Sequence, residues 1–81
     1  WAIGTGDVCD DAEAERVCAL IRSVLTDMTS SEVADCVRVL YGGSVKPSNS
    51  KGLFSQPNID GGLVGGASLD ADGFVRIILS A

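Results

Sequence analysis

The sequence predicts an α/β fold with parallel strands, of which this chain forms only a part. Short extended segments alternate with helical ones along the 81 residues, and alternation with short connections is typical of parallel strands joined by right-handed crossovers. With 46% hydrophobic and 21% charged residues, the composition is that of a packed protein. Two full strands and the end of a third are too few to cover both faces and both edges of such a sheet.

The chain opens with an extended segment and then its clearest helix. Residues 1–6 (WAIGTG) begin apolar and end in glycines, and we interpret them as the end of a strand and the turn after it. Residues 10–28 are expected to be helical, because apolar residues recur at steps of three and four and form one apolar face. Asp10 with Glu13 has the pattern of a capping box. Thr29 with Glu32 repeats that start signal over a short turn.

The next elements are two strands with a short helix between them. Residues 37–41 (VRVLY) are β-branched and aromatic, as in a strand. Residues 48–56 are expected to form a helix with Ser48 as its cap. In the second strand, residues 59–64, the glycines at 61 and 62 indicate a close approach of backbone.

A final helix is predicted to begin at Asp70. Its inward-facing stripe is expected to consist of four residues: Ala71, Phe74, Ile77 and Ile78. The sequence thus predicts three main helices.

Charge and composition exclude several functions. The net charge of −5, with only six Lys and Arg, argues against binding to nucleic acid or to an anionic membrane. Apolar runs of three to four residues are too short to span a bilayer. The sequence has no histidine, so Ser-His-Asp or Cys-His catalysis and a histidine-containing metal site are excluded within it. Three cysteines without metal-site or redox spacing are typical of reduced thiols in a cytoplasmic protein.

Three glycine-rich turns carry the functional signal. They contain Gly4 to Gly6, Gly42 to Ser44 and Gly65 to Ser68, and the last two each follow a strand. Glycine lets backbone N–H groups approach an oxyanion closely, and a helix N-terminus favours negative charge. Several such turns at one end of a parallel sheet predict a phosphate cradle. The alternative is that each glycine only permits a tight turn.

The segments WAIGTG, YGGSVKP and IDGGLVGGASL, in this order and spacing, resemble the C-terminal third of the triosephosphate isomerase family. The resemblance covers essentially the whole chain. It implies that residues 1–81 are the C-terminal fragment of a single (β/α)8 barrel domain, from the mobile lid through the last three βα units. This fragment would contain two parallel strands and a strand stub.

The resemblance also implies roles for individual residues. The lid would include Trp1, Ala2, Ile3, Gly4, Thr5, Gly6 and Cys9. The substrate would contact backbone N–H groups of Gly4, Ser44, Gly65 and Gly66, with Leu63 lining the pocket. Ser44 would also offer its hydroxyl to the lid near Gly6, and Tyr41 would hydrogen-bond to the far hinge of the lid near Cys9.

The implied activity is the interconversion of dihydroxyacetone phosphate and glyceraldehyde 3-phosphate, without cofactor or metal, by a cytoplasmic homodimer of glycolysis and gluconeogenesis. The catalytic glutamate, histidine and lysine of the family fall outside these residues. We therefore expect no catalytic residue in this chain and no activity from it alone. The alternative is a non-catalytic, phosphate-binding partial barrel that needs a complementary chain.

Some positions depart from the family pattern. Asp7 reverses a usual positive charge in the lid hinge. Asn58 stands where many members carry aspartate, so an ion pair with Arg22 is expected to be replaced or shifted to Asp60. Lys46, past the cradle, is expected at the surface rather than on the phosphate. Two cysteines are expected to be buried packing residues: Cys18 and Cys36.

Overall fold

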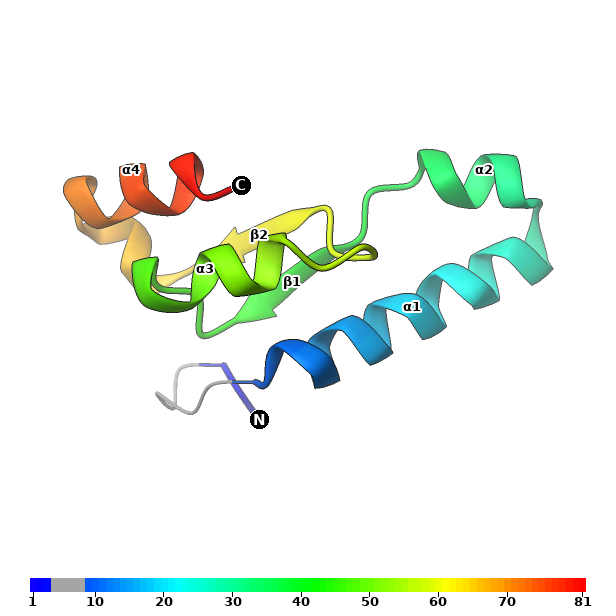
Figure 1. The fold of residues 1–81 in the computed structure, drawn as a ribbon, viewed down its shortest axis with the longest axis horizontal. Helices are drawn as coiled ribbons and strands as arrows, with labels where there is room; N and C mark the ends of the chain where they lie inside the picture. Colours follow the sequence, from blue (N-terminus) through cyan, green and yellow to red (C-terminus); the bar gives the residue numbers. More distant parts are fainter. Residues whose placement is uncertain (4–8) are drawn as a thin grey trace.

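The computed structural model describes residues 1–3 and 9–81. Within them the chain alternates helices and strands, as expected, and ends in a 3-10 helix and a further α-helix (Figure 1). The prediction of three main helices is wrong, because the described residues form four α-helices. In chain order the elements are α1 (Asp11–Met28), α2 (Ser31–Cys36), β1 (Leu40–Gly43), α3 (Pro47–Phe54), β2 (Gly61–Val64), η1 (Gly66–Leu69) and α4 (Ala71–Leu79).

The two strands pair in parallel, which confirms the predicted topology. Leu40 lies opposite Gly61 and Gly43 opposite Val64. Both strands begin later than predicted, because other groups occupy the backbone of the preceding residues. The carbonyl of Val37 accepts from Arg22 Nη1 at 3.0 Å, and the N–H of Val39 donates to a carboxylate oxygen of Asp60 at 2.8 Å.

The caps of the first two helices differ from the predicted ones. At α1 the Asp10 side chain accepts from the N–H of Ala12 at 3.2 Å, while Glu13 does not close a capping box and instead pairs with Arg16 at 2.6 Å. The predicted turn at residues 30–35 is the helix α2. Its cap is Ser30, whose hydroxyl accepts from the N–H of Val33 at 3.2 Å.

The later helices also start differently. α3 begins at Pro47 with Lys46 at the N-cap position, so Ser48 lies inside the helix and is not the cap. α4 follows Asp70 as predicted, but the Asp70 side chain makes no capping hydrogen bond. The predicted stripe on α4 is only partly right: Ile77 is buried, whereas Ala71 and Ile78 are exposed.

The core lies where α3 meets the two strands and α1. α3 lies between α1 and α4 (Figure 1), and its Leu53 is fully buried. The strand glycines are closely approached as expected, but by a side chain rather than by backbone, because a Cβ at Gly62 would lie 2.9 Å from the Phe54 ring. Ten residues form the buried apolar cluster: Ala2, Cys9, Ala14, Cys18, Val39, Tyr41, Val45, Leu53, Ile59 and Ile77.

A network around Arg22 joins the segments that precede the two strands. Its guanidinium donates to the Asp60 carboxylate at 2.6 Å, to Asn58 Oδ1 at 3.0 Å and to the carbonyl of Ala34 at 2.7 Å. The ion pair has therefore shifted from position 58 to Asp60, one of the two predicted outcomes. The N–H of Asp60 returns a bond to the carbonyl of Val39 at 2.8 Å.

Candidate functional site

A cavity of about 300 Å³ lies at the carboxyl ends of the two strands. Adjacent parallel strands end at the same sheet edge, so the turns after β1 and β2 meet there. The structure thus brings together two of the three glycine-rich segments, although Gly42 and Gly43 belong to β1 and only Ser44 follows it; the third, at Gly4 to Gly6, lies outside the described residues. The lining residues are Gly43, Ser44, Val45, Lys46, Gly65, Gly66 and Ala67.

The glycines on the two sides of this cavity differ in what they do. A Cβ at Gly65 or Gly66 would have no atom within 4 Å, and neither residue has a positive φ. No neighbouring atom therefore excludes a side chain at either position, and the space that it would fill is open to a ligand. Gly43 fits the tight-turn alternative, because its φ is +150° and a Cβ would lie 2.8 Å from the Tyr41 hydroxyl.

Asn49, which no sequence motif singled out, holds the turn after β1. Its Nδ2 donates to the carbonyl of Ser44 at 2.9 Å, and its Oδ1 accepts from the N–H of Lys46 at 2.7 Å. Asparagine three residues after the N-cap position was the available signal. One side chain thus fixes the backbone on both sides of Val45.

Ser44 also links the cavity to the first residues of the chain. Its hydroxyl donates to the carbonyl of Ala2 at 2.9 Å. Ala2 is buried, while its neighbours Trp1 and Ile3 are each 77% exposed. These three residues are not in a strand, so the predicted strand end is not found among them; the rest of that segment is outside the described residues.

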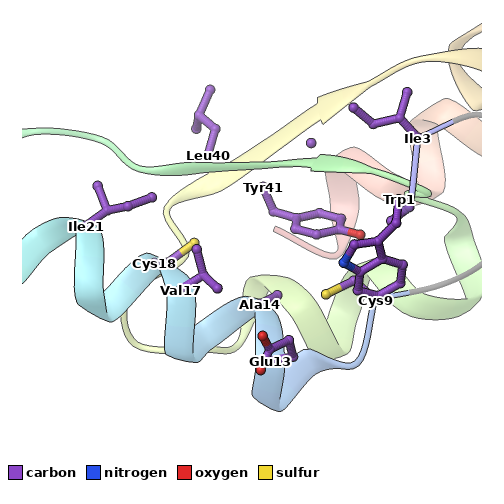
Figure 2. Close-up of a pocket in the computed structure, with 12 residues that line it drawn as sticks. Trp1, Ile3, Cys9, Glu13, Ala14, Val17, Cys18, Ile21, Leu40 and Tyr41 are labelled. Atoms are coloured by element: carbon purple, nitrogen blue, oxygen red, sulfur yellow. The ribbon is translucent and has the colours of Figure 1, made fainter.

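A second cavity, of about 290 Å³, lies between the first residues, α1 and β1 (Figure 2). The rings of Trp1 and Tyr41 and the thiol of Cys9 gather at one end of it, and Cys18, Val17 and Ile21 of α1 lie toward the other. Most lining residues are apolar, and Glu13 is the carboxylate among them. This composition favours an apolar occupant over an anion.

The Tyr41 hydroxyl is buried and makes no hydrogen bond within residues 1–3 and 9–81. Burial raises the pKa of Tyr41, and the nearby Cys9 thiol adds to the rise. The backbone of Cys9 opposes that rise in pKa, so it lies near the hydroxyl, but the contact falls short of hydrogen-bond geometry. The predicted bond between Tyr41 and the hinge near Cys9 is thus an approach without a completed bond.

The three thiols are all free. Burial raises the pKa of Cys9, with further contributions from Glu13 and Asp10, and burial also raises the pKa of Cys18. Cys36 was expected to be buried, but it is exposed because it ends the short helix α2 away from the sheet. A raised pKa keeps a thiol protonated and slow to react.

Leu63 and other possible features of a site can be placed as well. Leu63 is 71% exposed on β2 and is not among the residues that line the glycine cavity.

The part of the chain that the structure describes contains no group of three or more residues able to hold a metal ion. No helix in that part is long and apolar enough to cross a membrane.

Parallel strands joined through a helix, with glycine-rich segments at their carboxyl ends, place this chain among the α/β proteins. The sequence model of the family described as "Triosephosphate isomerase" matches residues 1–81. The chain belongs to the triosephosphate isomerase family.

Individual relatives agree with this assignment. The chain is 57% identical over 81 residues, all of its length, to the triosephosphate isomerase of Chlorobium phaeobacteroides, and 58% identical over 77 residues, 95% of its length, to that of Streptomyces avermitilis. The aligned regions cover 32% and 30% of those two proteins. The chain therefore spans about a third of the length of the relatives it matches.

Proposed function

We propose that this chain forms the phosphate-binding part of a triosephosphate isomerase, an enzyme that interconverts dihydroxyacetone phosphate and glyceraldehyde 3-phosphate. The observation that carries the proposal is the open glycine-lined cavity at the carboxyl ends of β1 and β2. In the proposed assignment, residues 1–81 are the C-terminal fragment of a (β/α)8 barrel domain.

Backbone N–H groups bind the phosphate in this proposal. Ser44, Gly65 and Gly66 line the cavity, and Gly4 would add a fourth donor from the lid. Backbone donors suit this chain because its net charge is −5, so the bulk of its surface does not attract anions. Fixed N–H dipoles can hold a phosphate without reorganisation when it binds.

The proposed lid consists of residues 1–9. The bond from the Ser44 hydroxyl to the carbonyl of Ala2 fastens one end of it. At the other end, the buried Tyr41 hydroxyl has a free donor close to Cys9, so a small shift of Cys9 would complete a latch. Leu63 would line the pocket only when further chain covers β2.

Proton transfer between the two triose carbons needs groups that this chain does not supply. The sequence contains no histidine, and the glutamate, histidine and lysine of the proposed mechanism would come from outside residues 1–81. The 81 residues alone are therefore proposed to be inactive. The full-length protein is proposed to be a cytoplasmic homodimer that needs no cofactor.

A second candidate is a non-catalytic partial barrel that assembles with a complementary chain. Large exposed apolar side chains favour it, since the surface carries Leu79 at 78%, Leu63 at 71% and Leu20 at 56% exposure. These side chains lie on α4, β2 and α1, and exposed apolar side chains of this size can pack against further polypeptide. In this candidate the phosphate site is retained and the isomerisation is absent.

The test uses the full-length protein that carries this sequence. We expect it to interconvert the two triose phosphates, with inorganic phosphate as a competitive inhibitor. Gly66→Val should raise KM roughly ten- to a hundredfold, because its side chain would fill the open space and push the phosphate away from a backbone donor, and a lost charged hydrogen bond is worth about 1.5–3 kcal/mol. Phosphate inhibition without isomerisation would favour the partial barrel, and the absence of both would overturn the cradle.

A further inference from the structure

We propose that Lys46 is a further anion-binding residue of the glycine cavity, whose ammonium group provides the positive charge that the backbone donors lack. This inference rests on the proposed function, because it concerns the same phosphate site. From the sequence, Lys46 was expected at the surface and past the cradle. It is exposed, but it lines the cavity together with Gly65 and Gly66.

The backbone of Lys46 is held in place. Its N–H donates to Asn49 Oδ1 at 2.7 Å, and its carbonyl accepts from the N–H of Ser50 at 2.9 Å. It also stands at the N-cap position of α3, in extended conformation with φ −135° and ψ 162°. The side chain therefore starts from a fixed point on the cavity wall.

Lys46 is the one Lys or Arg among the described residues that line this cavity. Arg16 pairs with Glu13, and Arg22 pairs with Asp60, each at 2.6 Å. Within residues 1–3 and 9–81, Lys46 forms no ion pair, and no other Lys or Arg lines this cavity. Its charge is thus not neutralised by a carboxylate contact.

A lysine at this place would add both contact and selectivity. Its four-carbon stem carries three N–H donors on a compact charge, so it can reach an anion inside a cavity of about 300 Å³. Backbone N–H groups donate to any oxyanion, whereas Coulomb attraction grows in proportion to the charge of the ligand. Lys46 would therefore favour a phosphate dianion over a monoanion such as formate.

Asp70 provides an internal control of opposite sign. Asp70 and Pro47 both flank Gly73, since a Cβ there would lie 2.9 Å from Asp70 Oδ2 and 3.6 Å from Pro47 Cγ. Asp70 therefore lies near Pro47, the first residue of α3, and Pro47 directly follows Lys46 in the sequence. Its side chain makes no capping hydrogen bond, so Asp70→Asn removes a negative charge without removing a cap.

The experiment measures the affinity of the full-length protein for inorganic phosphate by calorimetric titration. At about 20 mM ionic strength we expect Lys46→Met to weaken binding roughly three- to tenfold, and at about 1 M salt less than twofold, because charges are screened within about 3 Å there. Lys46→Arg should stay within about twofold of wild type. Lys51→Met, which removes a lysine of α3 outside the cavity lining, should leave the affinity unchanged.

Further variants decide between outcomes. Asp70→Asn should tighten phosphate binding, and Lys46→Gln repeats the neutral substitution should Lys46→Met fold poorly. For wild type, formate should bind more weakly than phosphate, and this preference should shrink in Lys46→Met. Unchanged phosphate binding in both neutral Lys46 variants at low salt would overturn the role of Lys46 and leave the cradle standing. A wild-type protein that binds no phosphate would overturn the cradle as well.

Discussion

The two ends of the β1–β2 pair are formed by different kinds of groups: charged and polar side chains at one end, and glycines and backbone at the other. At the amino ends, Arg22, Asn58 and Asp60 join α1, the carboxyl end of α2 and both strand entries through charged side chains. At the carboxyl ends, glycines and backbone surround an open cavity, and Asn49 is the side chain that holds the turn after β1. Dense side-chain bonding at one end leaves the other free to be shaped for a ligand.

This division gives each end a distinct sensitivity. Side chains at the amino ends are expected to govern stability and those at the carboxyl ends to govern binding, as in barrels whose sites form at the carboxyl face. Substitutions that move both properties together would contradict the comparison.

Arg22→Met should cause the largest loss of stability. The guanidinium side chain is 15% exposed, and its removal leaves the Asp60 carboxylate and the carbonyls of Ala34 and Val37 without this donor. Breaking such a partly buried pair is expected to cost about 2–4 kcal/mol, somewhat below the range for fully buried pairs because Asp60 is 34% exposed. Urea unfolding of the full-length protein measures this loss in unfolding free energy.

Arg16→Met is the matched control for that substitution. Arg16 pairs with Glu13 on the exposed surface of α1, with 64% and 44% of the two side chains exposed. Such pairs contribute little because water screens them. The urea midpoint should not change measurably, and an equal loss from both arginines would mean that the network at the strand entries is not special.

Two single glycine-to-valine substitutions should have opposite effects: one should weaken phosphate binding, and the other should lower the stability of the fold. Gly66→Val should leave the unfolding midpoint unchanged, since a Cβ there meets nothing within 4 Å and the residue lies in the 3-10 helix η1, but it should weaken phosphate binding roughly ten- to a hundredfold by filling the cradle. Gly62→Val should do the reverse, because a Cβ would lie 2.9 Å from the Phe54 ring. Overpacking of this kind costs about 1–3 kcal/mol. Phosphate titration and urea unfolding of both variants are the measurements.

The sequence predicted the carboxyl ends better than the amino ends. Glycine turns after two strands place backbone at a common edge whatever the neighbouring side chains are, so Gly65 and Gly66 could be assigned to a cavity in advance. The strand starts could not, because side chains from distant segments occupy the backbone groups of Val37 and Val39. Local propensity does not contain such long-range bonds.

The caps show the same limit at short range. Asp10, Ser30 and Lys46 all stand at helix starts, but several neighbouring polar residues were equally suitable in sequence. Which one caps depends on backbone geometry within one residue. The contact of Arg22 was predicted in part. The sequence left two outcomes for its ion pair, loss or a shift to Asp60, and the structure shows the pair with Asp60.

Asn58→Asp tests whether the amino-end network depends on an amide. Asn58 Nδ2 and the Asn58 N–H both donate to the Glu15 carboxylate at 2.7 Å, while Asn58 Oδ1 accepts from Arg22. An aspartate at position 58 would keep the contact with Arg22, but its carboxylate would repel the carboxylate of Glu15. We expect a loss of about 1–2 kcal/mol in unfolding free energy at neutral pH.

Glu15→Gln supplies the rescue for that substitution. With an amide at position 15 and a carboxylate at 58, donor and acceptor exchange places, so the double variant should recover most of the lost stability. The coupling energy from a double-mutant cycle is the measurement. Additive losses would show that Glu15 and Asn58 do not act on each other.

Acid should loosen the amino ends through Asp60. The N–H of Val39 and then the Arg22 guanidinium hold the pKa of Asp60 below its usual value of 3.8. A lowered folded-state pKa means that the carboxylate stabilises the fold above pH 3.8 and that this stabilisation is lost as the pH falls through the lower folded value. The effect should be smaller than that of Asn58→Asp, because the carboxylate is 34% exposed and partly screened.

Urea midpoints of wild type and Asp60→Asn between about pH 7 and pH 3 measure this loss of stability in acid. The difference between the two proteins should be constant near neutrality and shrink toward the acid end. A difference that persists unchanged to pH 3 would mean that Asp60 supports the strand entries through its shape and neutral hydrogen bonds, and not through its charge.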